Sequence, residues 1–112
     1  MTDPTPRDEL LPGTLDMLVL HSLALGTMHG YAIAQHIERL SADVLRVEQG
    51  SLYPALDRLL RKGWVTAEWG ETPTKRRARY YTITDSGLAH LDAELARYDR
   101  VSTAIARVLR RA

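Results

Sequence analysis

The sequence has no cysteine, which excludes disulfide bonds and zinc sites built on thiolates and is compatible with a reducing cytoplasm. No apolar run approaches the roughly 20 residues that a membrane-crossing helix needs. The first residues, MTDPTPRDELLPG, are polar and proline-rich and lack the apolar segment of a signal peptide. We therefore expect a cytoplasmic protein that has no membrane partner and begins with a flexible arm at residues 1–11.

Signatures of catalysis and of metal binding are equally scarce. No glycine-rich phosphate loop is present, and Ser51 stands in the context GSLY rather than in a GxSxG nucleophile elbow. Of the four histidines, His29 and His36 fall within one helix pattern. They would lie about two turns apart there, so a shared metal ion would need ligands from elsewhere. The sequence predicts no enzyme, no metal site and no cofactor.

The charges are unevenly spread along a chain of ordinary composition. The 112 residues suffice for one domain, and 45% apolar with 26% charged residues is typical of a soluble globular protein. Net charge is only +1, but eight of the 15 basic and four of the 14 acidic residues lie between Arg46 and Arg79. This local basic excess fits a DNA-binding segment, although a solvated face of mixed charge would produce the same count.

Two helix patterns come first. Residues 15–25, LDMLVLHSLAL, are apolar almost all round after Thr14, a plausible capping residue, which indicates a central helix. A second helix follows Gly30. Its expected inner face carries Tyr31, Ala34, Ile37 and Leu40, with Ile33 beside them.

A third helix leads directly into two strand-like runs. Gly50 or Ser51 is its expected cap, and Gly63 ends it. Its inward stripe consists of Leu52, Leu56, Leu59 and Leu60. Residues 64–71 and 78–84 alternate with period two, and their connection, ETPTKRR, is too long for a two-residue turn. A helix followed by a hairpin with a basic tip predicts an α+β, mainly α fold, a winged helix-turn-helix in which residues 12–84 bind DNA.

The third helix is the expected recognition helix. Its first turn offers hydroxyls and backbone N–H groups that suit phosphate contacts. Tyr53 and Arg58 lie off the leucine stripe and are expected to face the major groove or its flanking phosphates. The alternative is an ordinary amphipathic surface helix. The predicted DNA-binding residues are Gln49, Ser51, Tyr53, Pro54, Arg58, Arg61, Lys75, Arg76 and Arg77.

Residues 85–112 are expected to form a long C-terminal dimerisation helix. Thr84 or Asp85 can cap it, and it would reach roughly 39 Å by residue 110. A stripe at 3-4 spacing predicts the dimerisation residues Leu88, Leu91, Leu95, Tyr98, Ile105 and Leu109, with Ser102 in the same row. A second copy would cover a stripe too long for one small domain to bury. The alternative is a helix that folds back onto its own core.

Three stretches resemble the PadR family of winged-helix transcriptional regulators: HGYAIAQHI (29–37), QGSLYPALDRLLRKGWV (49–65) and RRARYYTITDSG (76–87). The resemblance covers roughly residues 12–112 and fits the shorter subgroup with a single C-terminal helix. It implies a dimeric DNA-binding repressor whose recognition helix holds Ser51, Tyr53 and Pro54, and whose last helix mediates dimerisation. Multidrug-sensing relatives carry a tryptophan on that last helix. Here both tryptophans lie in the hairpin region, which argues against a flat aromatic ligand.

The sequence thus predicts a sequence-specific transcriptional regulator that binds double-stranded DNA. We expect a homodimeric repressor on a palindromic operator, released by a small-molecule effector of unknown identity. One alternative is a DNA-binding protein without small-molecule control. Another is a protein–protein interaction module that uses the long helix and has lost DNA binding.

Overall fold

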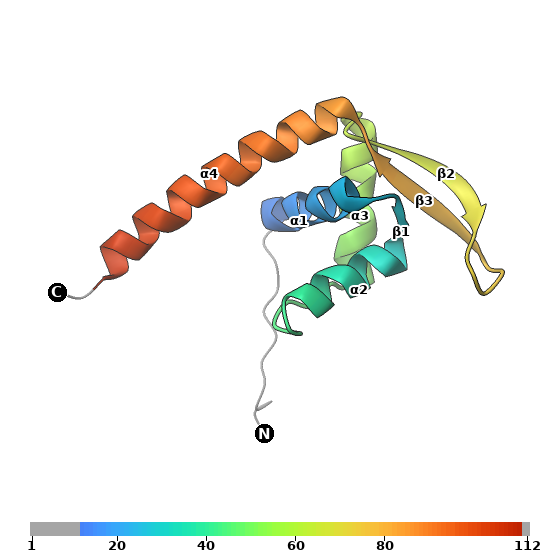
Figure 1. Cartoon of the computed structure of the whole chain (residues 1–112), viewed down its shortest axis with the longest axis horizontal. Helices are drawn as coiled ribbons and strands as arrows, with labels where there is room; N and C mark the ends of the chain where they lie inside the picture. Colours follow the sequence, from blue (N-terminus) through green and yellow to red (C-terminus); the bar gives the residue numbers. More distant parts are fainter. Residues whose placement is uncertain (1–11, 111–112) are drawn as a thin grey trace, which may run out of the picture.

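The computed structural model describes residues 12–110, so the predicted arm at residues 1–11 lies outside the described residues. The elements are α1 (Pro12–Leu25), β1 (Met28–His29), α2 (Gly30–Leu40), α3 (Gln49–Arg61), β2 (Val65–Glu71), β3 (Arg77–Ile83) and α4 (Asp85–Leu109) (Figure 1). The predicted α+β, mainly α winged helix-turn-helix is confirmed. The expected elements all form, and β1 is an addition to them.

Helix α1 is the centre of the core. It packs against α2, α3, α4 and β3, which is why its sequence is apolar almost all round. Its buried side chains are Leu15, Met17, Val19, Leu20, Ser22 and Leu23. The one hydroxyl among them is satisfied inside the helix, because Ser22 Oγ donates to the Leu18 carbonyl at 2.8 Å. Each large apolar side chain buried here contributes about 1.5–3 kcal/mol.

Helix α2 buries only part of the face predicted for it, and Ala34 of that face packs against the core. Gly30, Ile33 and Ile37 point inward, whereas Tyr31 and Leu40 are 62% and 66% exposed. The predicted face took every third residue, and each such step falls about 60° short of a full turn. Over three steps the face rotates by about half a turn, so Tyr31 and Leu40 cannot lie on the same side.

Helix α3 is set by its leucine stripe and its C-terminal glycine. Leu52, Leu56 and Leu59 are buried as expected, together with Ala55. The helix begins earlier than predicted, with Glu48 as its cap residue and no side-chain capping bond. Gly63 ends it at φ 73°, a left-handed conformation that favours glycine, and the Trp64 N–H then donates to the Leu59 carbonyl at 3.0 Å.

The sheet has the antiparallel order β1-β3-β2. Strands β2 and β3 pair from Val65 opposite Ile83 to Glu71 opposite Arg77, which confirms the predicted hairpin. The two-residue strand β1 adds to the other edge of β3, with Met28 opposite Tyr81. This pairing joins the start of α2 to the hairpin. His29 strengthens the junction, because its Nδ1 accepts from the Ala32 N–H at 3.2 Å and caps α2.

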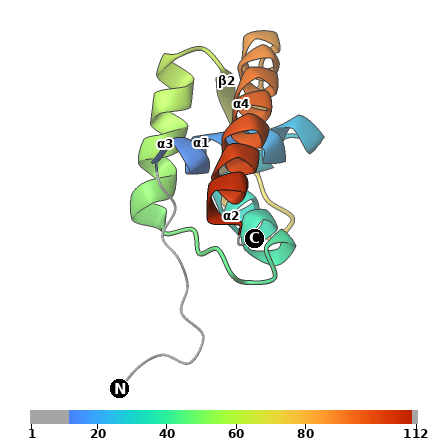
Figure 2. The same ribbon diagram turned by 90° about the vertical axis from the view of Figure 1, so that its left-hand side faces the viewer.

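Helix α4 is fixed at its start and projects at its end. The Thr84 hydroxyl accepts from the Gly87 N–H at 3.1 Å and lies 2.8 Å from the Gly63 carbonyl, to which it donates. From there α4 passes beside α1, and its second half extends beyond the other elements (Figures 1 and 2). Within residues 12–110, no helix is long and apolar enough to span a membrane.

Candidate nucleic-acid interface and dimer face

The outer face of α3 lies opposite its leucine stripe. Successive helical residues are about 100° apart, so the positions farthest from the stripe are those of Gly50, Pro54, Asp57 and Arg61. Their spacing is 4-3-4, and all four residues are exposed. Gln49 and Ser51 are exposed at the first turn. The structure therefore brings four of the predicted α3 residues, Gln49, Ser51, Pro54 and Arg61, to solvent around the exposed side of the helix.

Arg58 forms an ion pair with Asp16 of α1. Its Nη2 donates to Asp16 Oδ1 at 2.8 Å and its Nε donates to Asp16 Oδ2 at 3.3 Å, so the guanidinium is held against α1 by two bonds. The hydrogen bond that Arg58 donates to Asp16 raises the pKa of Arg58, against a smaller opposing effect of burial. Arg58 does lie off the leucine stripe, but on the flank next to α1. Its expected contact with the major groove or the flanking phosphates stays a prediction.

Tyr53 occupies the opposite flank, next to α2 and the sheet. Its side chain is 46% exposed, and its ring lies directly over Gly30. A Cβ at position 30 would stand 2.8 Å from the Tyr53 hydroxyl oxygen, so the Tyr53 ring takes this position only because residue 30 has no side chain. The HGY stretch of the sequence is thereby explained in part by the packing of Tyr53.

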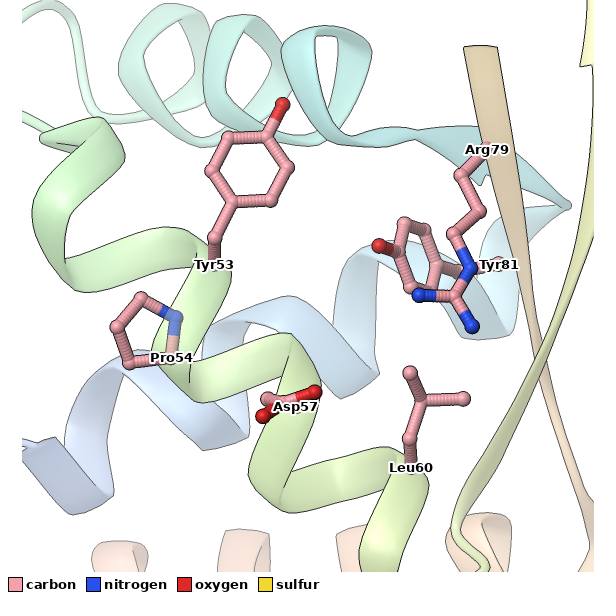
Figure 3. A pocket seen from close by; sticks show the side chains of 6 residues that line it. All are labelled: Tyr53, Pro54, Asp57, Leu60, Arg79 and Tyr81. Atoms are coloured by element: carbon pink, nitrogen blue, oxygen red, sulfur yellow. The ribbon is translucent and has the colours of Figure 1, made fainter.

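Two hollows flank Tyr53. The smaller, of about 410 Å³, lies between α3 and β3 and is lined by Tyr53, Pro54, Asp57, Leu60, Arg79 and Tyr81 (Figure 3). The larger, of about 980 Å³, separates the start of α2 from the wing. Its walls carry three cations, Arg76, Arg77 and Arg79, and the exposed aromatic rings of Tyr31 and Trp69. Cations interleaved with aromatic rings are suited to a nucleic-acid backbone.

The basic wing tip is held by its own turn. Thr72 organises it, because its N–H donates to the Arg76 carbonyl at 2.8 Å and its hydroxyl accepts from the Arg76 N–H at 3.1 Å. Lys75 adopts a left-handed φ of 62°. The Arg77 guanidinium lies over the Trp69 ring, 4.5 Å from its centroid, a cation–π contact between β3 and β2. Lys75, Arg76 and Arg77 are all exposed.

Arg79 was absent from the predicted set, yet it lines both hollows. It stands two residues beyond Arg77 on β3, and residues two apart on a strand share a face, so this signal was present in the sequence. Its guanidinium lies over the Tyr81 ring at 6.0 Å from the centroid. Burial raises the pKa of Tyr81, and the charge of Arg79 partly opposes that effect.

The apolar stripe of α4 divides into a buried and an exposed part. Leu91 is 3% exposed and belongs to the core of its own chain, because α4 packs on α1 at this level. Its assignment to a partner-facing stripe is therefore corrected. The other predicted residues are exposed in the single chain, as are Val101 and Val108. These exposed fractions are Leu88 40%, Leu95 37%, Tyr98 56%, Val101 45%, Ile105 53%, Val108 83% and Leu109 72%.

No cluster of three metal-ligating side chains occurs among residues 12–110. Two of the four histidines have structural contacts. His29 caps α2 and meets Tyr80 edge to face, and the imidazole of His90 lies against Trp64. The contacts of His29 and His90 do not resemble a catalytic centre. The fold, with its exposed α3 face and basic wing, is that of a winged helix-turn-helix protein.

The comparisons with known proteins agree with this class. The model of the "Transcriptional regulator PadR-like family" matches residues 19–93, more than half of the chain. The chain belongs to this family. It is therefore a DNA-binding transcriptional regulator and not an enzyme, as the sequence predicted.

Solved structures of similar fold include a transcriptional regulator from Clostridium thermocellum, with a TM-score of 0.80 and 26% identity over 88% of this chain and 95% of that one. A PadR family transcriptional regulator from Eggerthella lenta has a TM-score of 0.76 and 30% identity, over 89% of this chain and 85% of that one. The negative transcriptional regulator PadR of Bacillus subtilis is 28% identical over 87 residues, which make up 78% of this chain. This chain spans only 48% of the length of that relative.

Proposed function

We propose that this chain is a repressor that binds a palindromic DNA operator as a homodimer. Residues 12–84 would form the DNA-binding domain, with α3 in the major groove and the wing on the adjacent backbone. Residues 85–112 would form the dimerisation region, whose helix α4 ends at Leu109. The observation that carries the proposal is the convergence of the exposed α3 face and the three arginines of the wing around the two hollows. A relative named as a negative regulator supports repression rather than activation.

The DNA contacts divide by chemistry. Gln49, Ser51 and Tyr53 offer hydrogen-bonding groups along the first turns of α3, the part of a recognition helix that meets base edges and phosphates. Lys75, Arg76 and Arg77 supply sequence-independent affinity, because cations near phosphates release bound counterions. A regulator must share a compartment with its DNA, and on this ground we propose the cytoplasm as the location.

The second copy is proposed from the exposed stripe of α4. Seven large apolar residues on one helix are at least 37% exposed in the single chain. A contiguous apolar surface of this length marks an interaction site. Most homo-oligomers are twofold-symmetric dimers, so a second copy of this chain is the proposed partner. Two α4 helices packed along this stripe would shelter side chains worth about 1.5–3 kcal/mol each when fully buried. Dimerisation would also separate the two recognition helices by about one helical turn of DNA, so that both can enter the major groove on the same side of the duplex.

Release by a small-molecule effector is proposed for the same region. A hollow of about 300 Å³ lies between the start of α1 and the middle of α4. Its lining includes Met17, Glu94, Arg97, Tyr98 and Val101, so it offers both charges and an aromatic ring. A compound that stabilises the protein against heat and dissociates it from DNA supports this control. If the protein is released from DNA only by added salt, whose cations compete for the phosphates, the DNA-binding function stands without an effector.

Selection from a randomised duplex library tests the DNA-binding proposal. The purified protein is expected to enrich a motif with twofold symmetry, and fluorescence anisotropy should show tighter binding to that duplex than to its shuffled sequence. The difference should persist at near-physiological salt, where specific affinities typically exceed non-specific ones by at least about 10³-fold. A library that stays random after repeated rounds would support the interaction-module alternative.

A further inference from the structure

The outer face of α3 carries a carboxylate at one of its four outward positions. Asp57 is the only acidic residue between Gln49 and Arg61, and its side chain is 63% exposed. It lies with Pro54 and Arg61 on the side opposite the leucine stripe. Asp57 is not among the DNA-binding residues that the sequence predicts.

A carboxylate on a DNA-facing helix needs a chemical reason. Phosphate oxygens repel it, and so do the N7, O6 and O4 acceptors on the base edges of the major groove. The donors available there are the exocyclic amino groups of cytosine and adenine. Adenine places its N7 acceptor beside that amino group, so cytosine N4 is the better partner for a carboxylate.

The surroundings of Asp57 leave it free to act in this way. Arg61 Nη1 donates to Asp57 Oδ2 at 2.8 Å, one helical turn along the same face, which places a cation beside the carboxylate. Asp57 Oδ1 has no hydrogen-bond partner within residues 12–110. Figure 3 shows the carboxylate at the edge of the smaller hollow, with Arg79 and Tyr81 across from it and Pro54 one turn before it.

We propose that Asp57 is a specificity-determining residue that accepts a hydrogen bond from cytosine N4 in each half-site. Arg61 holds the carboxylate and faces the acceptor side of the same C·G pair, where guanine presents O6 and N7. The pair of side chains thus offers an acceptor beside a donor, which is complementary to that base pair. This inference rests on the proposed function, because it requires α3 to enter the major groove.

The test compares base preference position by position. Duplexes based on the selected operator carry each of the four base pairs at each half-site position, and binding is measured for wild type, Asp57→Ala, Asp57→Asn and the control Asp92→Asn. Asp92 is an exposed acidic residue of α4, so its variant makes the same change of charge away from α3. Circular dichroism and thermal unfolding should match wild type for all three variants, because both sites are exposed.

Wild type and Asp92→Asn should prefer cytosine about tenfold or more at one position per half-site. Asp57→Ala should reduce that preference to about twofold or less while preferences at other positions stay intact. Asp57→Asn should move the preference toward adenine, because an amide can bond both N6 and N7. Preferences that survive in Asp57→Ala, with affinity altered equally on all duplexes, would overturn the inference and leave the proposed function standing. A wild-type protein that selects no DNA would overturn the proposed function, and this inference with it.

Discussion

The indole ring of Trp64 lies flat against the imidazole of His90, with the ring centroids 3.6 Å apart and the planes 11° from parallel. This stack joins the turn after α3 to the second turn of α4. The Thr84 and Ser86 hydroxyls reinforce the same junction by donating to the Gly63 carbonyl, and the Thr84 N–H donates to the Trp64 carbonyl at 2.9 Å. The direction in which α4 leaves the domain is therefore tied to the end of α3. In a dimer this junction would set the separation of the two recognition helices.

Replacing Gly87 with alanine should disrupt that junction. A Cβ at position 87 would stand 2.1 Å from the Trp64 carbonyl oxygen, a backbone atom that cannot move without shifting the hairpin. We expect Gly87→Ala to lower the free energy of unfolding by about 1–3 kcal/mol, measured by urea denaturation. Gly50→Ala is the matched control, because nothing lies within 4 Å of a Cβ there. Equal stability of the two variants would show that the junction is not tightly packed.

The stability of the fold should decrease at alkaline pH because of Tyr81. Burial raises the pKa of this phenol above its ordinary value of 10.0, so the folded chain retains the proton when the unfolded chain loses it. The unfolded state then binds fewer protons, and stability falls as the pH rises through and above about 10. Tyr81→Phe should flatten this decline in urea titrations between pH 8 and 11. An unchanged pH profile in that variant would assign the decline to other groups.

Neutralising the wing should weaken binding to every DNA sequence alike. Arg76→Ala combined with Arg77→Ala removes two cations, and the slope of log K against log salt should decrease by roughly 2 units. The control is Arg100→Ala with Arg107→Ala, which removes two exposed cations from the side of α4 away from its apolar stripe. If the wing variant loses affinity for one operator only, with its salt slope intact, the wing reads bases instead of the backbone.

Charges placed on the exposed stripe of α4 should separate the proposed dimer. Leu95→Glu with Ile105→Glu should yield a folded monomer in sedimentation velocity at micromolar concentration, where wild type sediments as a dimer. Ala93→Glu with Ala96→Glu adds the same charges at exposed positions off the stripe and should remain dimeric. Leu91→Glu should unfold the chain, because Leu91 is buried in the core. A monomeric wild type would contradict the proposed dimer face.

Periodicity within the sequence was enough to predict the helices, the hairpin and the basic wing. These features depend on neighbours within a few residues, such as the leucine spacing of α3 and the glycine that ends it. The two-residue strand β1 was missed because nothing within Met28–His29 distinguishes it from a turn. It exists only because β3 offers an edge to pair with.

Contacts between distant residues decide the features of the candidate site that the sequence did not show. Arg58 and Asp16 lie far apart in the sequence, and their ion pair depends on how α3 crosses α1. Leu91 and Leu95 belong to the same stripe in the sequence of α4. Leu91 is buried and Leu95 is exposed because of the path that α4 takes over α1. An amphipathic pattern shows which residues avoid water, but not which surface covers them.

Hydroxyl-radical footprinting on the selected operator, combined with the stoichiometry of the complex, tests most directly whether two recognition helices read one palindrome. We expect two chains per duplex and two equivalent protected segments related by a dyad, with centres about 34–36 Å apart or a multiple of that distance. Both segments should lose protection together when Leu95 and Ile105 carry glutamate substitutions. A single protected segment, bound by one chain with undiminished affinity, would contradict this mode of recognition.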